Sequence, residues 1–402
     1  MGLKRFSWLL SHLHLNDNAK MPKVGDDNFD KLYKVRPYLN KLNQQFDECY
    51  HPSQNQSVDE SMIKFKGRCA FKQYMPMKPT KRGYKVWVRA DDKGYVCQFE
   101  IYTGKKTRDS KPTKDLGPKV VKDLTSKLEG KNYKIYADNF FSSIPLAKYL
   151  SEKDIGYCGT IRSNRKYIPD FTNDKSMKQG DSDWRMEPNG ISMTKWMDNK
   201  AVYFISNMHN PSEEQQTTRR QKDGTLLPVP GRKISVDYNK NMGFVDKADM
   251  LRALYQCDRK SKKWWHRIFF YFLDVTLVNA YVIFCNLNED KITLKMFKTR
   301  VVHGLAGTSG LKSKDRKRIS GEFSEASPAV GPASKKFKTK IPQEIRLQKS
   351  DHLPSRIASH RRCNYCSTKK EPHRTIWECS LCQVPLCNNK RGCFTKFHSV
   401  GN

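Results

Sequence analysis

The chain has 402 residues, enough for two to four domains at roughly 100–200 residues each. Its 75 Lys and Arg against 41 Asp and Glu give a net charge of +34. That charge favours a polyanionic partner, with nucleic acid first and an anionic membrane surface or a ribosome second. The most apolar stretch, residues 268–285, is interrupted by Asp274 and Asn279, and no apolar signal core follows Met1. The sequence therefore predicts neither a membrane-spanning helix nor secretion.

Hydrophobic spacing predicts helices within residues 1–50 and strands within residues 56–102, where alternation on both sides of residues 91–94 is typical of a hairpin. Farther along, helices are predicted at 116–128, 143–150, 243–254 and 264–285, and strands at 133–137, 155–161, 191–196 and 201–206. Residues 165–240 change in composition, with several Trp, Met and Asn residues, and have the character of an insertion. We therefore expect a mixed α/β fold.

Residues 306–362 are rich in Ser, Pro, Lys and Arg and poor in large apolar residues, which is typical of a linker. Two basic runs within it, residues 312–318 and 335–340, resemble nuclear-import signals, although a solvated charge run is the alternative.

Four acids lie where a sheet and a helix can bring them together. Asp59 stands in the first strand region, Asp138 ends an apolar strand, and Asp246 and Asp249 share a helix face three residues apart. Carboxylates that share a site bind divalent cations, and Mg²⁺ suits them because it prefers oxygen ligands. Two such ions can activate a water or a 3′-OH and stabilise a leaving oxygen. Taken singly, each acid could equally be a solvated strand end, a turn residue or a first-turn acid favoured by the helix dipole.

Three basic clusters are candidate DNA contacts, since Lys and Arg neutralise phosphates and an aromatic ring can stack on an unpaired base. The clusters are Lys78, Lys81, Arg82 and Lys85; Arg162, Asn164, Arg165 and Lys166; and Arg259, Lys260, Lys262 and Lys263, followed by Trp264 and Trp265. The alternative is a solvated basic face, and for Trp265 we expect a place in the helix core.

Six of the twelve cysteines lie close to the C-terminus. The spacing is Cys363-x2-Cys366-x12-Cys379-x2-Cys382-x4-Cys387-x5-Cys393-x4-His398, with His373 between the two CxxC pairs. Two such pairs predict zinc. Eight ligands would hold two zinc ions in a RING- or PHD-like cross-brace. A ribbon with one zinc ion and spare cysteines is the main alternative, and disulfides are disfavoured in a basic intracellular protein.

Several long blocks, in order, resemble the piggyBac transposase family. They are VDESMIKFKGR (58–68), YMPMKPTKRGYK (74–85), ADNFFSSIPLA (137–147), GTIRSN (159–164), VDKAD (245–249) and DRKSKKW (258–264), and the Cys-rich tail also fits. The resemblance covers nearly the whole chain. By it, Met1 falls inside the helical domain that precedes the catalytic core in this family.

The resemblance implies an RNase H-like catalytic core with Asp59, Asp138 and Asp246 as the catalytic triad and Asp249 as a fourth acid, all holding Mg²⁺. It implies a C-terminal finger that recognises the DNA of element ends. The implied domains are a helical dimerisation and DNA-binding domain (1–54 and 255–303), the core (55–164 and 232–254), a strand-rich insertion (165–231), a basic linker (304–362) and the zinc finger (363–398).

Our first hypothesis is therefore a nuclear, homodimeric DNA transposase without a membrane segment, which cuts and pastes double-stranded DNA at TTAA sites through a hairpin intermediate. The second is a domesticated nuclear DNA-binding protein that uses the same fold without catalysis. A RING-type ubiquitin ligase is the third, and it would leave the upstream blocks unexplained.

Overall fold

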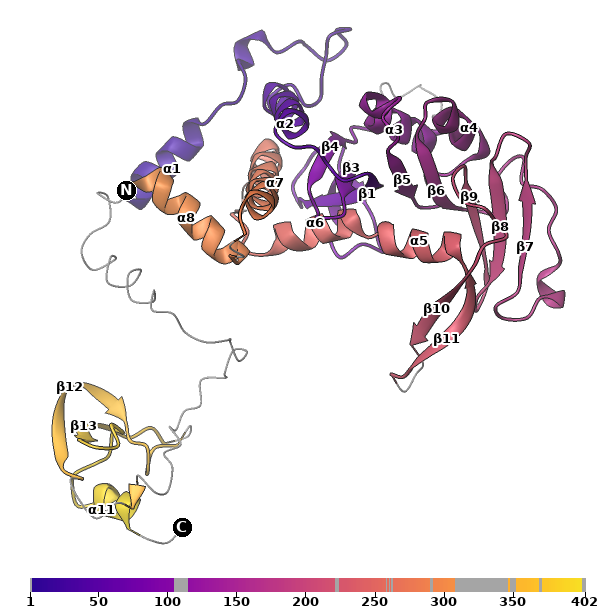
Figure 1. Ribbon diagram of the computed structural model, residues 1–402. Helices are drawn as coiled ribbons and strands as arrows, with labels where there is room; N and C mark the ends of the chain where they lie inside the picture. The colour runs from indigo at the N-terminus through magenta and orange to yellow at the C-terminus, as the bar shows by residue number, and fades with distance from the viewer. Residues whose placement is uncertain are drawn as a thin grey trace. The chain divides into compact units, whose positions relative to one another are not determined.

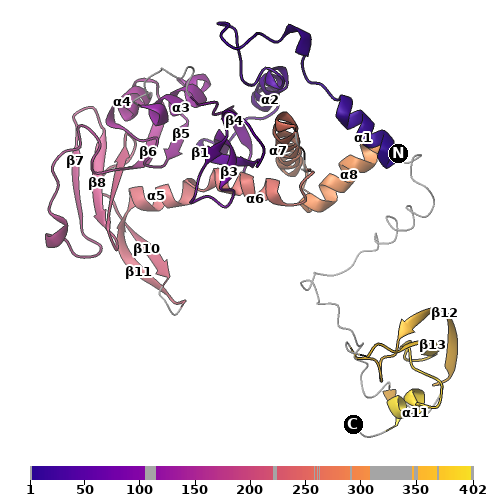
Figure 2. The same ribbon diagram turned by 180° about the vertical axis from the view of Figure 1, so that it is seen from behind.

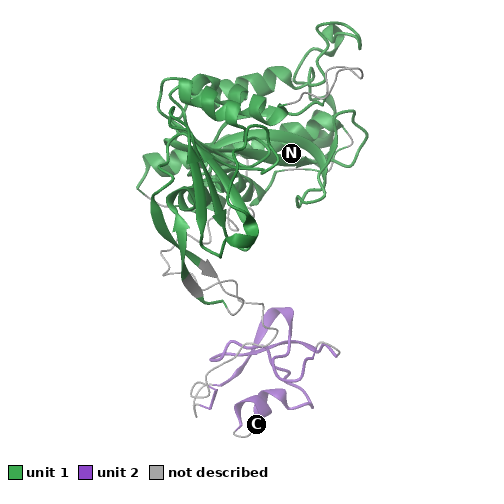
Figure 3. Ribbon diagram, turned by 90° about the vertical axis from the view of Figure 1, so that its right-hand side faces the viewer, with its two compact units in different colours: residues 1–310 green, residues 311–402 purple. Residues whose placement is uncertain are grey.

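The computed structural model describes residues 2–104, 115–220, 224–257, 259, 261, 263–289, 292–307, 346–347, 352–368 and 371–399. These residues form two compact units, residues 1–310 and residues 311–402, which Figure 3 shows in different colours. The finer domain divisions expected from the sequence stay predictions.

Unit 1 is a mixed α/β structure, as expected (Figure 1). Its helices are α1 (Leu3–His12), α2 (Arg36–Glu48), α3 (Leu116–Thr125), α4 (Ile144–Glu152), α5 (Lys233–Asn241), α6 (Phe244–Ala253), α7 (Trp264–Leu287) and α8 (Leu294–Ala306), with 3-10 turns η1 (Asn18–Lys20), η2 (Ser126–Leu128) and η3 (Asp174–Ser176). Its strands are β1 (Asn55–Lys64), β2 (Gln73–Tyr74), β3 (Arg82–Asp91), β4 (Val96–Ile101), β5 (Lys134–Ala137), β6 (Gly156–Ile161), β7 (Ser182–Met186), β8 (Ser192–Met197), β9 (Ala201–Ser206), β10 (Glu214–Arg220) and β11 (Leu226–Arg232). Of the predicted helical region 1–50, only α1 and α2 are α-helical.

Nine strands form one sheet in the order β2-β3-β1-β5-β6-β9-β8-β7, with β4 also on β3. Strands β1, β5 and β6 are parallel, whereas β3 is antiparallel to β1 and β9 is antiparallel to β6. The expected insertion therefore adds β7–β9 to the edge of the main sheet, because β9 pairs directly with β6. Its other part, the β10–β11 hairpin, projects from the sheet in Figures 1 and 2.

The sheet is covered on both faces, and the two-residue repeat of a strand decides which core each side chain joins. On β1, Val58 joins the apolar cluster with α3 and α4, whereas Ile63 joins the cluster with α2, α6 and α7. Phe99 of β4 meets Phe272 of α7 with ring centroids 4.0 Å apart. The strand β1 is therefore held from both sides, which fixes the carboxylates that it carries.

Helix α7 is the long central helix of the apolar cluster that also contains α2 and α6. By length and composition it could cross a membrane, yet half of its most apolar window is buried inside unit 1. The two polar residues that interrupt its apolar stretch are paired there: Asp274 forms an ion pair with Lys298 at 3.3 Å, and Asn279 makes two hydrogen bonds of 2.9 Å to the backbone of Val96. Trp265 is 6% exposed and belongs to this core, as expected.

Unit 2 contains β12 (Pro354–Arg362) antiparallel to β13 (Arg374–Cys379), and the short helix α11 (Cys393–His398). Its buried cluster consists mainly of cysteines, joined by Val384, Leu386 and Phe397. Strand β12 falls inside the segment that composition assigned to a linker. Its side chains are mostly exposed, so no apolar alternation marks it in the sequence, and pairing with β13 alone makes it a strand.

Candidate active site

The register of the parallel strands brings Asp59 and Asp138 together. Val58 of β1 lies opposite Ala137 of β5, and each is followed by one of the two acids. Asp138 Oδ1 accepts a 2.8 Å bond from the Phe140 N–H, so the expected turn geometry is present as well. The turn hydrogen bond does not prevent Asp138 from binding a cation, because a carboxylate has several acceptor sites.

Asp246 stands in the first turn of α6, where it is exposed, and its charge acts on Lys78, the neighbour of Asp59. Helix α6 packs on β1 and β3 through Val245 and Ala248, which are buried. The turn between β3 and β4 supports it from the side: Gly94, at φ +81°, leaves room for α6, and Lys247 donates a 2.7 Å bond to the Asp92 carbonyl. These contacts fix the position of α6 on strands β1 and β3.

A lysine ammonium lies among these acids. Lys78 Nζ is 3.9 Å from Asp59 Oδ2 and 3.3 Å from Glu60 Oε1. Burial lowers the pKa of Lys78, but Asp59 and Glu60, with a smaller contribution from Asp246, outweigh it and leave that pKa above its ordinary value. Lys78 is thus the common neighbour of carboxylates from β1 and α6.

Burial dominates the acids of the two strands. Burial, helped by the charges of Glu60 and Asp138, raises the pKa of Asp59 to about 7, although Lys78 and the Glu60 backbone N–H oppose the rise. Burial also raises the pKa of Asp138, against the Phe140 N–H bond, which lowers it. Acids that share a desolvated site in this way gain from a bound cation, since the ion removes their mutual repulsion.

Asp249 is held differently from the other three acids. Both of its oxygens lie within hydrogen-bond distance of the Ser61 Oγ, at 2.7 and 2.6 Å, and Oδ1 also accepts from Arg252 Nε at 3.3 Å. Tyr271 OH lies 3.4 Å from Oδ1 and 2.7 Å from Ser61 Oγ. The carboxylate therefore has protein partners for both oxygens.

The first basic cluster is split between surface and interior. Lys81 and Arg82 are exposed, as a DNA contact requires. Lys85 is only 8% exposed: its ammonium lies 3.9 Å from the centroid of the Trp87 ring and 3.6 Å from Glu60 Oε2. The structure thus places Lys85 behind Glu60, outside the exposed basic surface, because the neighbouring carboxylate and ring take up its charge.

The second basic cluster makes hydrogen bonds to the loop that follows Asp138. Arg162 Nε donates a 2.9 Å bond to the Asn139 side chain, and Arg165 donates to the carbonyls of Asn139 and Phe140 at 3.1 and 3.0 Å. Arg162 is exposed. These residues can therefore orient the loop and present positive charge beside the acids at the same time.

The remaining members of that cluster, Asn164 and Lys166, line a cavity of about 750 Å³. Lys122 and the first turns of α3 and α4 complete its wall. Gly117 of α3 is required there, since a Cβ would collide with the Phe140 carbonyl. The cavity thus adjoins the loop that carries Asp138.

The third cluster follows α6. Arg259 lies 4.6 Å from the centroid of the Phe6 ring, and Lys263 donates a 2.7 Å bond to the Ser11 carbonyl. Both residues are exposed and tie this segment to α1. Two other predicted residues lie outside the described residues, Lys260 and Lys262.

Trp264 is half-buried, and its ring lies perpendicular to the Phe71 ring with the centroids 5.5 Å apart. It also lines a cavity of about 230 Å³ with Lys34, Arg68 and Lys263. The indole thus contributes to packing and to a basic hollow. Lys34 and Arg68 were missed in the sequence, because isolated cations far apart in the chain carry no local signal.

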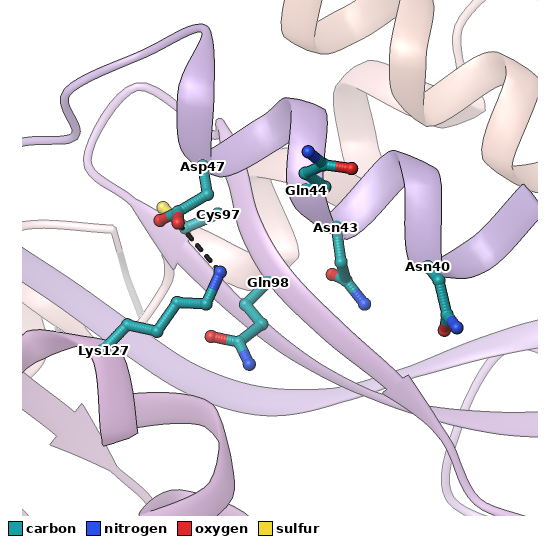
Figure 4. Close-up of a pocket in the computed structure, with 7 residues that line it drawn as sticks. All are labelled: Asn40, Asn43, Gln44, Asp47, Cys97, Gln98 and Lys127. Atoms are coloured by element: carbon teal, nitrogen blue, oxygen red, sulfur yellow. Dashed lines mark hydrogen bonds and ion pairs between the residues drawn. The ribbon is translucent and has the colours of Figure 1, made fainter.

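A second polar pocket of about 230 Å³ lies between α2 and β4 (Figure 4). Its Asn43 side chain makes two bonds of 3.0 Å to the Phe99 backbone and so covers the edge of β4. Asp47 and Lys127 form a closed ion pair of 2.8 Å on its wall. These groups already satisfy one another, so the pocket does not compete with the acid cluster as a candidate active site.

In unit 2 the structure forms two groups of four side chains, each with ligand atoms within 4.8 Å of one another. The groups are Cys363, Cys366, Cys387 and Cys393, and His352, Cys379, Cys382 and His398. All six predicted cysteines and His398 take part, and each group could hold one metal ion. In chain order the pair Cys379/Cys382 lies between the two cysteine pairs of the other group, and His352 and His398 stand at the two ends, so the groups interleave as in a cross-brace.

His352 was missed in the sequence, whereas the predicted ligand His373 belongs to neither group. The strand register explains the difference: Pro354 lies opposite Cys379, so His352 arrives beside Cys379, with Nδ1 3.2 Å from its Sγ. The His373 backbone instead bonds to Cys363 and Ser367. Among the described residues, the acids of unit 1 form no group as closed as these two.

The transposase family model described as Transposase IS4 matches residues 1–281. Human PiggyBac transposable element-derived protein 3 is 29% identical over 333 residues, 79% of this chain and 55% of that protein. Human PiggyBac transposable element-derived protein 2 is 29% identical over 289 residues, 69% of this chain and 47% of that protein. The chain thus spans about half the length of these curated relatives.

The fold is similar to that of the piggyBac transposase in a synaptic complex with hairpin DNA. The TM-score is 0.65 at 24% identity, over 96% of this chain and 78% of that one. At this identity the likeness concerns the fold alone. With the family match over most of unit 1 and the related human proteins beside it, the chain belongs to the piggyBac-type transposase family.

Proposed function

We propose that this protein is a DNA transposase that cuts and joins double-stranded DNA at TTAA sites, with a divalent cation held by Asp59, Asp138 and Asp246. One observation carries the proposal: β1, the loop after β5, and α6 bring these acids into one electrostatic neighbourhood with Lys78. The sequence separates them by up to 187 positions (246 − 59), so their meeting is not a matter of local composition.

The strand order supports an RNase H-like core. Strands β4-β3-β1-β5-β6 lie side by side, with β3 antiparallel to β1 and both β5 and β6 parallel to it. In this arrangement Asp59 lies within the central strand and Asp138 at the end of its parallel neighbour. The helix that carries Asp246 then packs across both β1 and β3.

The residue types fit Mg²⁺, since the hard carboxylates of Asp59 and Asp138 are partly buried, and burial raises the pKa of both, helped at Asp59 by the charges of Glu60 and Asp138. An ion held by these acids would activate a water or a 3′-OH and stabilise the leaving oxygen. Asp246 is exposed and Asp59 and Asp138 are only partly buried, so water and a phosphate can approach these acids. The chain's own part is to orient: Arg165 holds the Asp138 loop, and the exposed Lys81, Arg82 and Arg162 attract the DNA backbone.

Unit 2 is proposed to hold two structural zinc ions, one in each Cys/His group. Four thiolate and imidazole ligands whose atoms lie within 4.8 Å of one another fit the closed structural sites typical of zinc. By resemblance this module recognises element-end DNA. We further propose a homodimer and a nuclear location; the basic runs 312–318 and 335–340 lie outside the described residues.

The test is cleavage of a labelled duplex that carries the cognate element end and its TTAA flank, taken from genomic sequence beside the gene. We expect the wild type to nick and form a hairpin with Mg²⁺, and Asp138→Asn to lose at least about a hundredfold in rate. Asp170→Asn, an exposed acid away from the cluster, is the matched control and should cut normally. If wild type and variant bind DNA equally and neither cuts, the domesticated DNA-binding protein is the correct function.

A further inference from the structure

We propose that Asp249 is a positioning residue: together with Ser61 and Tyr271 it fixes α6 on β1, so that Asp246 meets Asp59 and Asp138, and it does not itself hold the metal. The inference rests on the proposed function, because it assigns a role within that site. It separates Asp249 from the other three acids, with which the sequence groups it.

The first argument is the hydrogen-bond inventory of the carboxylate. Ser61 Oγ lies 2.7 and 2.6 Å from its two oxygens, and Arg252 Nε and Tyr271 OH approach Oδ1 at 3.3 and 3.4 Å. The Arg252 guanidinium also lies 4.4 Å from the centroid of the Tyr271 ring, which steadies it. A metal would have to compete with a positive charge and two hydroxyls that are already in place.

The second argument is burial. Ser61 is 2% exposed and Tyr271 5% exposed, so water cannot replace Asp249 as their partner. If the carboxylate turned away to bind an ion, the two hydroxyls would keep only their mutual 2.7 Å contact. Leaving a buried donor without an acceptor is destabilising, which opposes that movement.

The third argument is geometry. Ser61 and Asp59 point to the same face of β1, two residues apart, which is about 7 Å along a strand. Asp249 and Asp246 are three residues apart on α6, which is about 4.5 Å along a helix and on one face. A bond between Ser61 and Asp249 therefore sets where the first turn of α6, with Asp246, stands relative to Asp59.

The experiment uses the full chain and two readouts. Mn²⁺ binding is measured by calorimetry, and hydrogen exchange is measured over α6. Asp249→Asn keeps an acceptor at Oδ1, so we expect Mn²⁺ affinity within about threefold of wild type, whereas Asp249→Ala and Ser61→Ala should each lower it about tenfold. Asp246→Asn, which removes a ligand, should lower it by more than about tenfold.

The hydrogen-exchange readout tests the Ser61–Asp249 contact separately from metal binding. Asp249→Ala and Ser61→Ala should speed exchange in α6 without metal, and Asp246→Asn should not. Ser57→Ala is the matched control, because Ser57 is a fully buried serine on the same strand whose hydroxyl has no hydrogen-bond partner among the described residues. That variant should leave both readouts unchanged.

Three results would decide against the positioning role: Asp249→Asn weakening Mn²⁺ as much as Asp246→Asn, unchanged α6 exchange in Asp249→Ala and Ser61→Ala, or the same changes in Ser57→Ala. If the wild type binds no Mn²⁺, the proposed function fails, and the exchange data alone then decide whether Asp249 anchors α6.

Discussion

The two candidate metal sites of this protein are built in opposite ways. In unit 1, Asp59 and Asp138 stand on a sheet with apolar clusters on both faces, and α6 is seated beside it by buried side chains. In unit 2, most of the buried cluster consists of the cysteines that could bind metal, with few apolar residues beside them. The acids of unit 1 stand on a fold that has its own apolar core, whereas the candidate ligands of unit 2 make up most of that unit's core.

The difference teaches where a metal contributes its free energy. Carboxylates that are supported by a separate core can stay in place without an ion and leave coordination positions open, which suits a reaction. Thiolates that replace a core are closed around their ion, and binding is then coupled to folding. Each of the following experiments acts on one side of this contrast.

The largest expected effect is the loss of unit 2 on removal of its metal. In the full chain, a zinc chelator or Cys379→Ser should abolish hydrogen-exchange protection in β12 and β13, because little apolar area remains to hold them. Protection in β1, β5 and α7 should persist. Survival of β12–β13 protection after complete removal of zinc would show that the ligands are not the core.

The next effect concerns the ligand that only the structure indicates. His352→Ala should lower the zinc content from two ions per chain to one, since it opens one of the two four-ligand groups. His373→Ala is the matched control and should keep both ions. Zinc content after dialysis, measured by metal analysis, checks this; the reverse pattern would restore His373 as the ligand.

A smaller effect is expected on the stability of unit 1. The pKa of Asp59 is about 7 in the folded protein and near 4 when unfolded, so between these values the native state binds more protons. The free energy of unfolding therefore falls as pH rises from about 4 to 7. Asp59→Asn, which cannot ionise, should stabilise metal-free unit 1 at pH 8 by about 1–3 kcal/mol.

Thermal unfolding of both proteins at pH 4 and pH 8, with EDTA present, measures this gain. The wild type and Asp59→Asn should differ little at pH 4, because Asp59 in the folded wild type is then protonated and, like asparagine, uncharged. An equal difference at both pH values would mean that the side chain acts through packing and not through its charge.

The smallest effect is expected at Lys78, whose ammonium lies among the acids. Lys78→Met keeps the side-chain length but removes the charge, so Mn²⁺ binding without DNA should tighten about three- to tenfold at low salt. Calorimetric titration at two salt concentrations checks it, with Lys81→Met as the exposed control. Unchanged or weaker Mn²⁺ binding would place the ion away from Lys78.

Local sequence was sufficient for much of this molecule. Near neighbours in the chain determine the hairpin around residues 91–94, the apolar strand just before Asp138 and the start of α4. At the start of α4, for instance, Ser143 Oγ accepts a 3.2 Å hydrogen bond from the Leu146 N–H. The CxxC pairs belong to the same class, because two residues between cysteines suffice to place both thiolates on one ion.

Tertiary structure alone decided the rest. Strands β7–β9 join the main sheet because β9 pairs with the free edge of β6, and Lys85 is buried because its ammonium pairs with Glu60 of the neighbouring strand β1. His352 replaced His373 because β12 pairs with β13 in one register. Asp249 turned to Ser61, 188 positions away. In each case the deciding partner is distant in sequence, and spacing along the chain carries no information about which distant groups share the same space.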